Sequence, residues 1–130
     1  MPEFSKTPAT VREYCDLREA SGLGAFPMEN ARIGLANTLT AVWLRDGDRL
    51  VGMARIIGDG GCFAQVTDVA VHPDFQRQGL GAKIMAQLLQ QARETLPSDL
   101  YLSLIADPGA ENLYEKSGFE PRYGMSLILP

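Results

Sequence analysis

Residues 72–85 read HPDFQRQGLGAKIM, and this stretch separates an apolar run from a helical pattern. The run ends at Val71, and from Leu80 onward apolar residues recur at helical spacing until the chain approaches Pro97. The first N–H groups of a helix have no partner inside it, and glycine lets a ligand approach the main chain. The stretch therefore predicts a strand, a glycine-rich corner (residues 72–81) and a helix, with an anion site at the corner.

Familiar phosphate-binding motifs do not account for this corner. A dinucleotide fingerprint needs Gly or Ala where Ile84 stands, and a P-loop needs Gly-Lys-Ser/Thr where residues 81–83 read Gly-Ala-Lys. The Gly-x-Gly spacing at 79–81 also occurs at 22–24 and 58–60, where ordinary turns are expected. Only the copy at 79–81 lies between a predicted strand and a predicted helix, so its context carries the prediction.

Upstream of the corner, the sequence predicts two helices. Thr10 and Glu13 have the spacing of a capping box, which indicates the start of the first helix. Residues 28–37 predict a second, shorter helix, with Ile33 and Leu35 in its apolar part.

Three strands follow these helices. Residues 39–45, 49–57 and 62–71 are apolar runs with residue types that favour strands. Asp-Gly-Asp at 46–48 separates the first two and reads as a tight hairpin turn. We therefore expect an antiparallel meander that leads into the corner.

Downstream of the corner, alternating elements complete the predicted fold. Residues 99–107 predict a buried strand that pairs in parallel with 63–71, and residues 110–119 a short helix ended by Gly118. Residues 123–129 predict a last strand that closes the sheet. The fold class is α+β, with a mixed sheet between helix layers, in a single domain over residues 1–130.

Two motifs in this order resemble the GNAT superfamily of N-acetyltransferases. The first is Gln/Arg-x-x-Gly-x-Gly/Ala, present at residues 76–81 directly after a strand that ends VAVHP. The second is LYEKSGF at residues 113–119, which is similar to a segment of that family. With the matching elements around them, the resemblance covers nearly the whole chain. It implies a GNAT-like sheet in which an antiparallel meander is followed by a splayed parallel strand pair, with helices on both faces.

The resemblance implies acetyl-coenzyme A (acetyl-CoA) as co-substrate. In that family the corner wraps the pyrophosphate through backbone amides, and the bulged strand before it turns free amides toward the pantetheine arm and the acetyl carbonyl. Carried over, the strand residues are Val69, Ala70 and Val71, whose apolar side chains are equally suited to plain core packing. The corner residues are Gln76, Arg77, Gln78, Gly79, Leu80, Gly81 and Ala82.

Tyr114 occupies the position of the family's usual tyrosine, which protonates the departing thiolate. The alternative is a tyrosine that packs one face of a short helix. The family's Asn-x-x-Ala-x-x-x-Tyr spacing is matched by Ala110 and Tyr114, but Asp107 stands where asparagine is usual. An ionised carboxylate accepts hydrogen bonds and cannot donate them, so this departure bears on the pantetheine contact.

The general base is the least determined part of the site. Asp68 lies on the strand before the corner, where it could take the amine proton or serve as a structural hydrogen-bonding group. A neutral amine with a water relay is a further alternative. Arg18 could anchor a substrate carboxylate or be a surface cation, and Trp43 could line a pocket or be a core aromatic.

Composition excludes several other classes of function. A net charge of −4 without clustered Lys and Arg argues against a nucleic-acid partner. No apolar run approaches the length of a membrane span, and no signal peptide precedes the first helix, so we expect a cytoplasmic protein. Cys15 and Cys62 lack metal-type spacing and are expected to be buried, and the chain has one histidine, so we expect no metal site.

The sequence thus predicts an acetyl-CoA-dependent N-acetyltransferase. It would move the acetyl group to a primary amine by direct attack in a ternary complex, and we expect this amine to belong to a small molecule, with a protein amino group as the alternative. The alternative is a non-catalytic acyl-CoA-binding or sensing module, which would use the corner without turnover. Members of the family commonly dimerise through the C-terminal strand region, and residues 123–130 are apolar enough to allow a homodimer.

Overall fold

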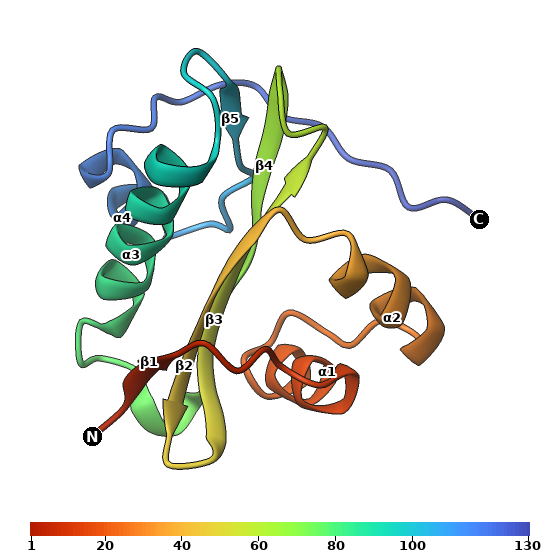
Figure 1. Cartoon of the computed structure of the whole chain (residues 1–130), viewed down its shortest axis with the longest axis vertical. Coiled ribbons are helices and arrows are strands. Elements are labelled where there is room, and N and C mark those ends of the chain that lie inside the picture. The colour runs from red at the N-terminus through yellow and green to blue at the C-terminus, as the bar shows by residue number, and fades with distance from the viewer.

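A five-stranded mixed sheet forms the centre of the computed structural model, which describes residues 1–130 (Figure 1). The strands lie in chain order, antiparallel from the first to the fourth, and the fifth is parallel to the fourth. Their bounds are β1 Glu3–Ser5, β2 Thr40–Asp46, β3 Arg49–Gly58, β4 Phe63–Val71 and β5 Tyr101–Ser103. The predicted fold class, with its meander and its parallel pair, is confirmed.

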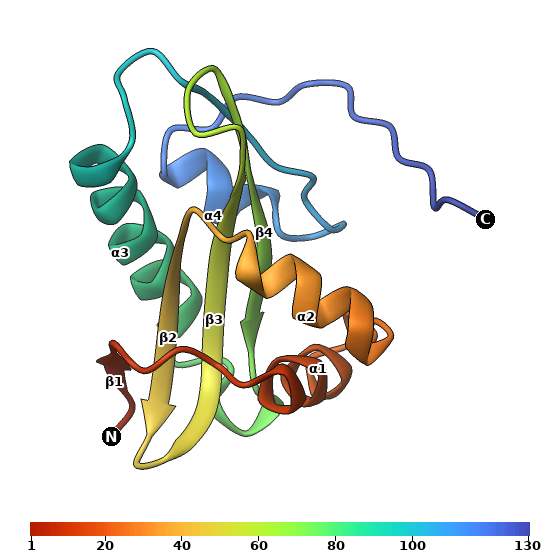
Figure 2. The same ribbon diagram turned by 45° about the vertical axis from the view of Figure 1, so that its right-hand side comes forward.

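Helices cover both faces of the sheet (Figures 1 and 2). α1 (Val11–Ala20) and α2 (Met28–Ala36) lie on one face, and α3 (Leu80–Thr95) and α4 (Glu111–Lys116) lie on the other. A 3₁₀ turn, Pro73–Phe75, lies in the corner between β4 and α3. None of these helices is both long enough and apolar enough to cross a membrane.

Each helix layer has its own apolar core. On the α3 face, Ile84, Met85 and Leu88 are fully buried against the sheet. On the α1 face, Leu17 packs with the buried strand residue Met53. The helical spacing of apolar residues that predicts α3 is therefore the spacing that fills the first core.

Local sequence signals correctly predict the ends of several elements. Thr10 and Glu13 form a capping box at the start of α1, in which each side chain accepts a hydrogen bond from the other residue's N–H. Gly47, with φ 61°, lies in the β2–β3 turn, and Gly118, with φ 100°, follows the end of α4.

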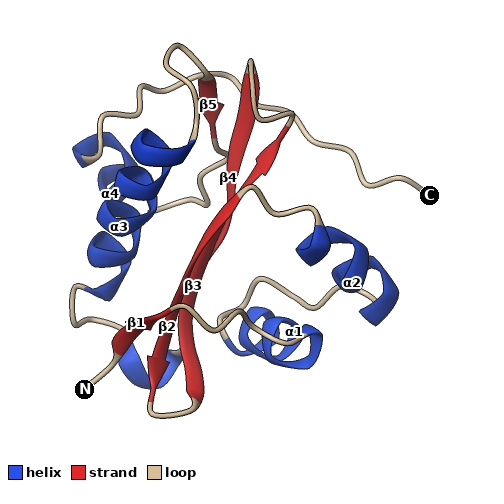
Figure 3. Ribbon diagram, in the orientation of Figure 1, coloured by secondary structure: helices blue, strands red, loops and turns tan.

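The C-terminal strands are the main error of the sequence prediction. β5 has only three residues of the predicted 99–107, and Tyr101 in it is 52% exposed. A strand over 123–129 is wrong, since this segment forms no strand and extends away from the sheet (Figure 3). β5 pairs with β4 over three residues only, and residues 123–129 pair with neither strand.

Two side chains also lie elsewhere than predicted. Ile33 is 52% exposed, because α2 packs through its Ala31 side. Cys62 is exposed at the start of β4, whereas Cys15 is buried in the α1 face, and both thiols are free.

Candidate active site

The corner is built from backbone turns. Gln76 folds back, and its Nε2 donates to the Val71 carbonyl at 2.9 Å. Arg77 and Gly79 adopt left-handed conformations, with φ 64° and 75°. Where left-handed residues alternate with right-handed ones, successive N–H groups point to one concave side of the backbone. The side chains of Gln76, Arg77 and Gln78 are exposed, whereas Leu80 is buried.

The first turn of α3 offers free backbone donors. Gly79 is the N-cap and contributes no side-chain bond, and the first helical bond runs from the Lys83 N–H to the Gly79 carbonyl at 3.3 Å. The N–H groups of Leu80, Gly81 and Ala82 therefore lack a partner within the helix. No acidic residue lies in this turn, and a Cβ on Gly79 would meet no atom within 4 Å. These donors lie at the positive end of the helix dipole, beside the open space at Gly79.

β4 and β5 pair at only one end, which leaves part of β4 unpaired. Residues 63–65 align with 101–103, and β5 then ends. The edge of β4 that faces away from β3 therefore has no strand partner from Val66 to Val71. This unpaired edge leads directly into the corner (Figure 1).

A bulge at Asp68 interrupts β4 along this edge. Thr67 pairs with Arg55, but Ala70 pairs with Met53, so β4 has one residue more than β3 between these pairs. Asp68 has a φ of 59°, a left-handed conformation that few residues other than glycine adopt.

The extra residue reverses which backbone groups of β4 face β3. Before the bulge, the Phe63 carbonyl accepts a bond from the β3 side at 3.0 Å, and after it the His72 N–H donates to β3 at 2.8 Å. The backbone N–H and carbonyl groups of successive strand residues point to alternate edges. The groups of odd-numbered residues therefore face β3 before the bulge, and those of even-numbered residues face β3 after it. Val69 and Val71 therefore turn their N–H groups to the unpaired edge, whereas Ala70 faces β3.

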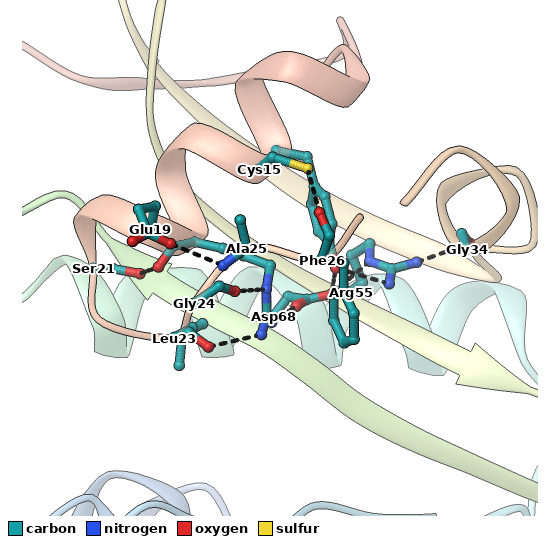
Figure 4. Close-up of polar contacts among 12 residues, drawn as sticks. Cys15, Glu19, Ser21, Leu23, Gly24, Ala25, Phe26, Gly34, Arg55 and Asp68 are labelled. Carbon is teal, nitrogen blue, oxygen red and sulfur yellow. Dashed lines mark hydrogen bonds and ion pairs between the residues drawn. The ribbon is translucent and has the colours of Figure 1, made fainter. Parts of the chain in front are cut away.

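Asp68 lies in a buried polar cluster with Tyr14, Arg18 and Arg55, here called the Asp68 cluster. Figure 4 shows Asp68 beside Arg55. The Oδ2 of Asp68 accepts from the Tyr14 hydroxyl and from Arg55 Nε, both at 2.8 Å, and its Oδ1 accepts from Arg18. The Asp68 side chain is 1% exposed. Two guanidinium groups face one carboxylate, so the cluster carries a net positive charge. Burial, followed by the charge of Asp68, raises the pKa of Tyr14, which keeps this hydroxyl a donor.

Both arginines of the cluster also hold neighbouring backbone. Arg55 Nη1 donates to the Gly34 carbonyl at 3.1 Å, at the end of α2. Arg18 donates from Nε to the Gly24 carbonyl at 2.7 Å and from Nη2 to the Leu23 carbonyl at 3.0 Å, so it holds the loop between α1 and α2 (Figure 4). Arg18 is therefore neither a surface cation nor a free anchor. Trp43, 8% exposed, belongs to the core of the α1 face.

Tyr114 lies on α4, which the fold brings against the start of α3. A Cβ on Gly81 would lie 3.7 Å from Leu113 Cδ2, so the two sequence motifs meet in space. The Tyr114 ring packs edge-on against Phe119, with 6.3 Å between centroids. Burial, followed by the charge of Asp107, raises the pKa of Tyr114, and the phenol stays protonated at neutral pH.

The predicted site residues thus fall into two groups. The corner, the unpaired edge of β4, Tyr114 and the exposed Asp107 gather on the α3 side. Asp68 contacts the α1 side of the sheet instead. Sequence reasoning missed Tyr14 and Arg55 as its partners. The available signal was Arg55 itself, a charged residue within the apolar run 49–57, where a buried charge requires a partner.

This arrangement defines a class of α+β proteins in which a bulged strand separates from its parallel neighbour beside an uncapped helix start. The family model for the acetyltransferase (GNAT) domain matches residues 18–124. The chain belongs to the GNAT acetyltransferase family.

Individual relatives agree with this assignment. An uncharacterized N-acetyltransferase, ycf52, from Pyropia yezoensis is 37% identical over 113 residues, which are 84% of this chain and 62% of that protein. A Staphylococcus aureus protein of unknown function, described as a probable acetyltransferase, has a solved structure that is 38% identical with a TM-score of 0.91, over 99% of this chain and 100% of that one. The ribosomal-protein-S18-alanine N-acetyltransferase of Escherichia coli is 19% identical with a TM-score of 0.76, over 95% of this chain and 80% of that one, and shows the fold alone. The chain spans about 62% of the length of the Pyropia relative it matches.

Proposed function

We propose that this protein is an acetyl-CoA-dependent N-acetyltransferase that acts on a primary amine of a small molecule. One observation carries the proposal: Val69, Val71 and Tyr114 pack against the same apolar cluster as α3, whose uncapped N-terminus belongs to the corner. Membership of the GNAT family supports acetyl-CoA as the acetyl donor. The residues present fit that molecule, because free N–H donors under open space at Gly79 suit a pyrophosphate.

When bound, acetyl-CoA supplies a thioester activated for attack by an amine. In our proposal the backbone of residues 76–82 holds the pyrophosphate. Val69, Ala70 and Val71 form the pantetheine and carbonyl site, and the N–H groups of Val69 and Val71 are the donors oriented for it. Asp107, an exposed carboxylate, could accept a hydrogen bond from the pantetheine arm but could not donate one.

Proton transfer completes the proposed mechanism, which is direct attack in a ternary complex. Tyr114 would act as general acid toward the departing thiolate, since its phenol is protonated at neutral pH. The role of general base predicted for Asp68 remains a prediction. The two Asp68 oxygens together already accept hydrogen bonds from three side chains. We therefore favour a water relay for the amine proton.

Titration calorimetry with acetyl-CoA and with free CoA tests the donor site. Gly79→Asp places a negative charge beside the free amides. Gly60→Asp is its matched control, since Gly60 has a similar φ, 79° against 75° for Gly79, but lies at the opposite end of β4. We expect affinity to fall by about tenfold or more in Gly79→Asp and to be unchanged in Gly60→Asp.

Catalysis is tested by thiol release with a panel of small amines. Release with an amine supports an enzyme, whereas binding without release by any amine supports the acyl-CoA-binding module. Failure of the folded wild type to bind either form of CoA overturns the proposal.

The proposal extends to the setting of the enzyme. A free, exposed Cys62 thiol supports a reducing compartment such as the cytoplasm. We also propose a homodimer in which the apolar segment 123–129 of each copy packs on the other copy. The exposure of Met125, Leu127 and Leu129, between 78% and 83%, supports a surface that a second copy covers.

A further inference from the structure

We propose that Asp68 is a positioning residue: with Tyr14, Arg18 and Arg55 it holds the β4 bulge in the form that turns the Val69 and Val71 amides toward the acetyl donor. The inference rests on the proposed function and gives the Asp68 cluster a role in it.

The bulge is what makes these amides available. Without the extra residue in β4, odd-numbered residues would continue to face β3, and the Val69 and Val71 N–H groups would pair within the sheet. The N–H group of Ala70 would then point to the unpaired edge in their place. The orientation of the proposed carbonyl site therefore depends on the conformation of the single residue Asp68.

Asp68 is held in that conformation by three side chains from two elements. Tyr14 and Arg18 reach it from α1, and Arg55 reaches it from β3, beside the bulge. Neither carboxylate oxygen is free, and the side chain is 1% exposed. This environment suits a fixed anchor, and it leaves no oxygen directed at an amine.

The cluster also couples the bulge to the loop between α1 and α2. Arg18 donates to the carbonyls of Leu23 and Gly24, and its guanidinium lies 4.6 Å from the centroid of the Phe26 ring. Through Asp68, this loop and the bulge form one hydrogen-bonded unit on the α1 face.

The test compares Asp68→Gly with Glu13→Gln. Glycine adopts a φ near +60° without strain, so Asp68→Gly removes the anchor but still permits the bulge. Glu13→Gln weakens a different ion pair, which Glu13 forms with Arg45 on β2. This pair lies away from the bulge, so the variant controls for a general loss of stability. Because Asp68→Gly leaves two buried arginines without their carboxylate, Tyr14→Phe provides a milder variant that keeps every charge and removes one bond to Asp68.

We expect the acetyl-CoA affinity, measured by calorimetry on folded protein, to fall by about tenfold in Asp68→Gly and about threefold in Tyr14→Phe, and to be unchanged in Glu13→Gln. Wild-type affinity in Asp68→Gly, or in Tyr14→Phe where Asp68→Gly does not fold, overturns the inference. A second result would also overturn the inference: in Asp68→Gly, kcat falls and the acidic limb of the pH profile is lost, while the acetyl-CoA affinity is unchanged. That result would make Asp68 the general base. No binding by the wild type itself overturns the proposed function, and this inference with it.

Discussion

A single carboxylate, Glu13, joins α1 to the sheet through Arg45, whose Nη1 and Nη2 lie 2.7 and 3.0 Å from its two oxygens. The hydrogen bonds from Arg45 lower the pKa of Glu13 from 4.5 to about 2. A carboxyl group whose pKa falls on folding stabilises the native state above its unfolded pKa, and this stability is lost as the pH falls toward the folded value. The ion pair should therefore stabilise the protein fully above pH 4.5 and progressively less between pH 4.5 and 2.

This gives a pH-dependent prediction for Glu13→Gln. At pH 7 the variant should lose about 1–2 kcal/mol, an amount reduced by the partial exposure of the side chain. Near pH 2 wild type and variant should be equally stable. Chemical denaturation at pH 7, 4 and 2.5 measures the difference, and a constant difference over this range would contradict the prediction.

Tyr114 carries the second prediction at this scale. Tyr114→Phe removes the proposed general acid and keeps the ring that packs against Phe119. Since general acids contribute about 10²–10⁴-fold, kcat should fall by about 100-fold or more, with acetyl-CoA affinity unchanged. Steady-state kinetics and calorimetry separate the two quantities, and full turnover in the variant would remove Tyr114 from the mechanism.

What sequence can predict about single residues depends on how far apart the partners are. The Thr10–Glu13 capping box and Gly118 are recognised within a few residues of sequence. The bonds to Asp68 from Tyr14 and Arg18 span 54 and 50 residues, and no local pattern specifies which distant side chains converge. Because of this separation in sequence, the roles of Asp68 and Arg18 could not be decided from the sequence.

At the scale of elements, α3 packs closely against β3 at Gly52. A Cβ there would lie 2.9 Å from Ile84 Cδ1 and 3.1 Å from Leu44 Cδ2. This close approach seats α3 on the sheet and so fixes where its free N-terminus, the corner, lies. Periodicity predicts α3 well, because its apolar spacing spans many residues, but it gives no information about such a contact.

Gly52→Ala should therefore destabilise the protein by about 1–3 kcal/mol, because the added methyl group forces Ile84 and Leu44 to move within a packed core. Gly34→Ala in α2 is the matched control. Its Cβ would meet no atom closer than 3.9 Å, and alanine favours a helix more than glycine does, so stability should hold or rise. Urea denaturation of the two variants compares them, and equal effects would argue against the close packing at Gly52.

For the whole molecule, sequence predicts the layers better than the boundary of the sheet. The order of elements, with long periodic helices and a meander, is enough to give an α+β fold with helices on both faces. The C-terminal strands fail because a strand needs a partner as well as a suitable composition. Residues 123–129 are mostly apolar, yet they form no strand, and β5 pairs with β4 over three residues only.

That unpaired segment carries the last prediction. If a second copy covers it, the wild type should sediment as a dimer at about 50 µM, because exposed apolar patches of this kind favour association. The double variant Leu127→Lys, Leu129→Lys should sediment as a monomer, since it places two charges in the segment. Ile33→Lys, which charges another exposed apolar residue, on α2, should leave the dimer intact. A monomeric wild type would refute this arrangement, because no association would then exist. Dissociation by both sets of substitutions would also refute it, because the association would not depend specifically on residues 123–129.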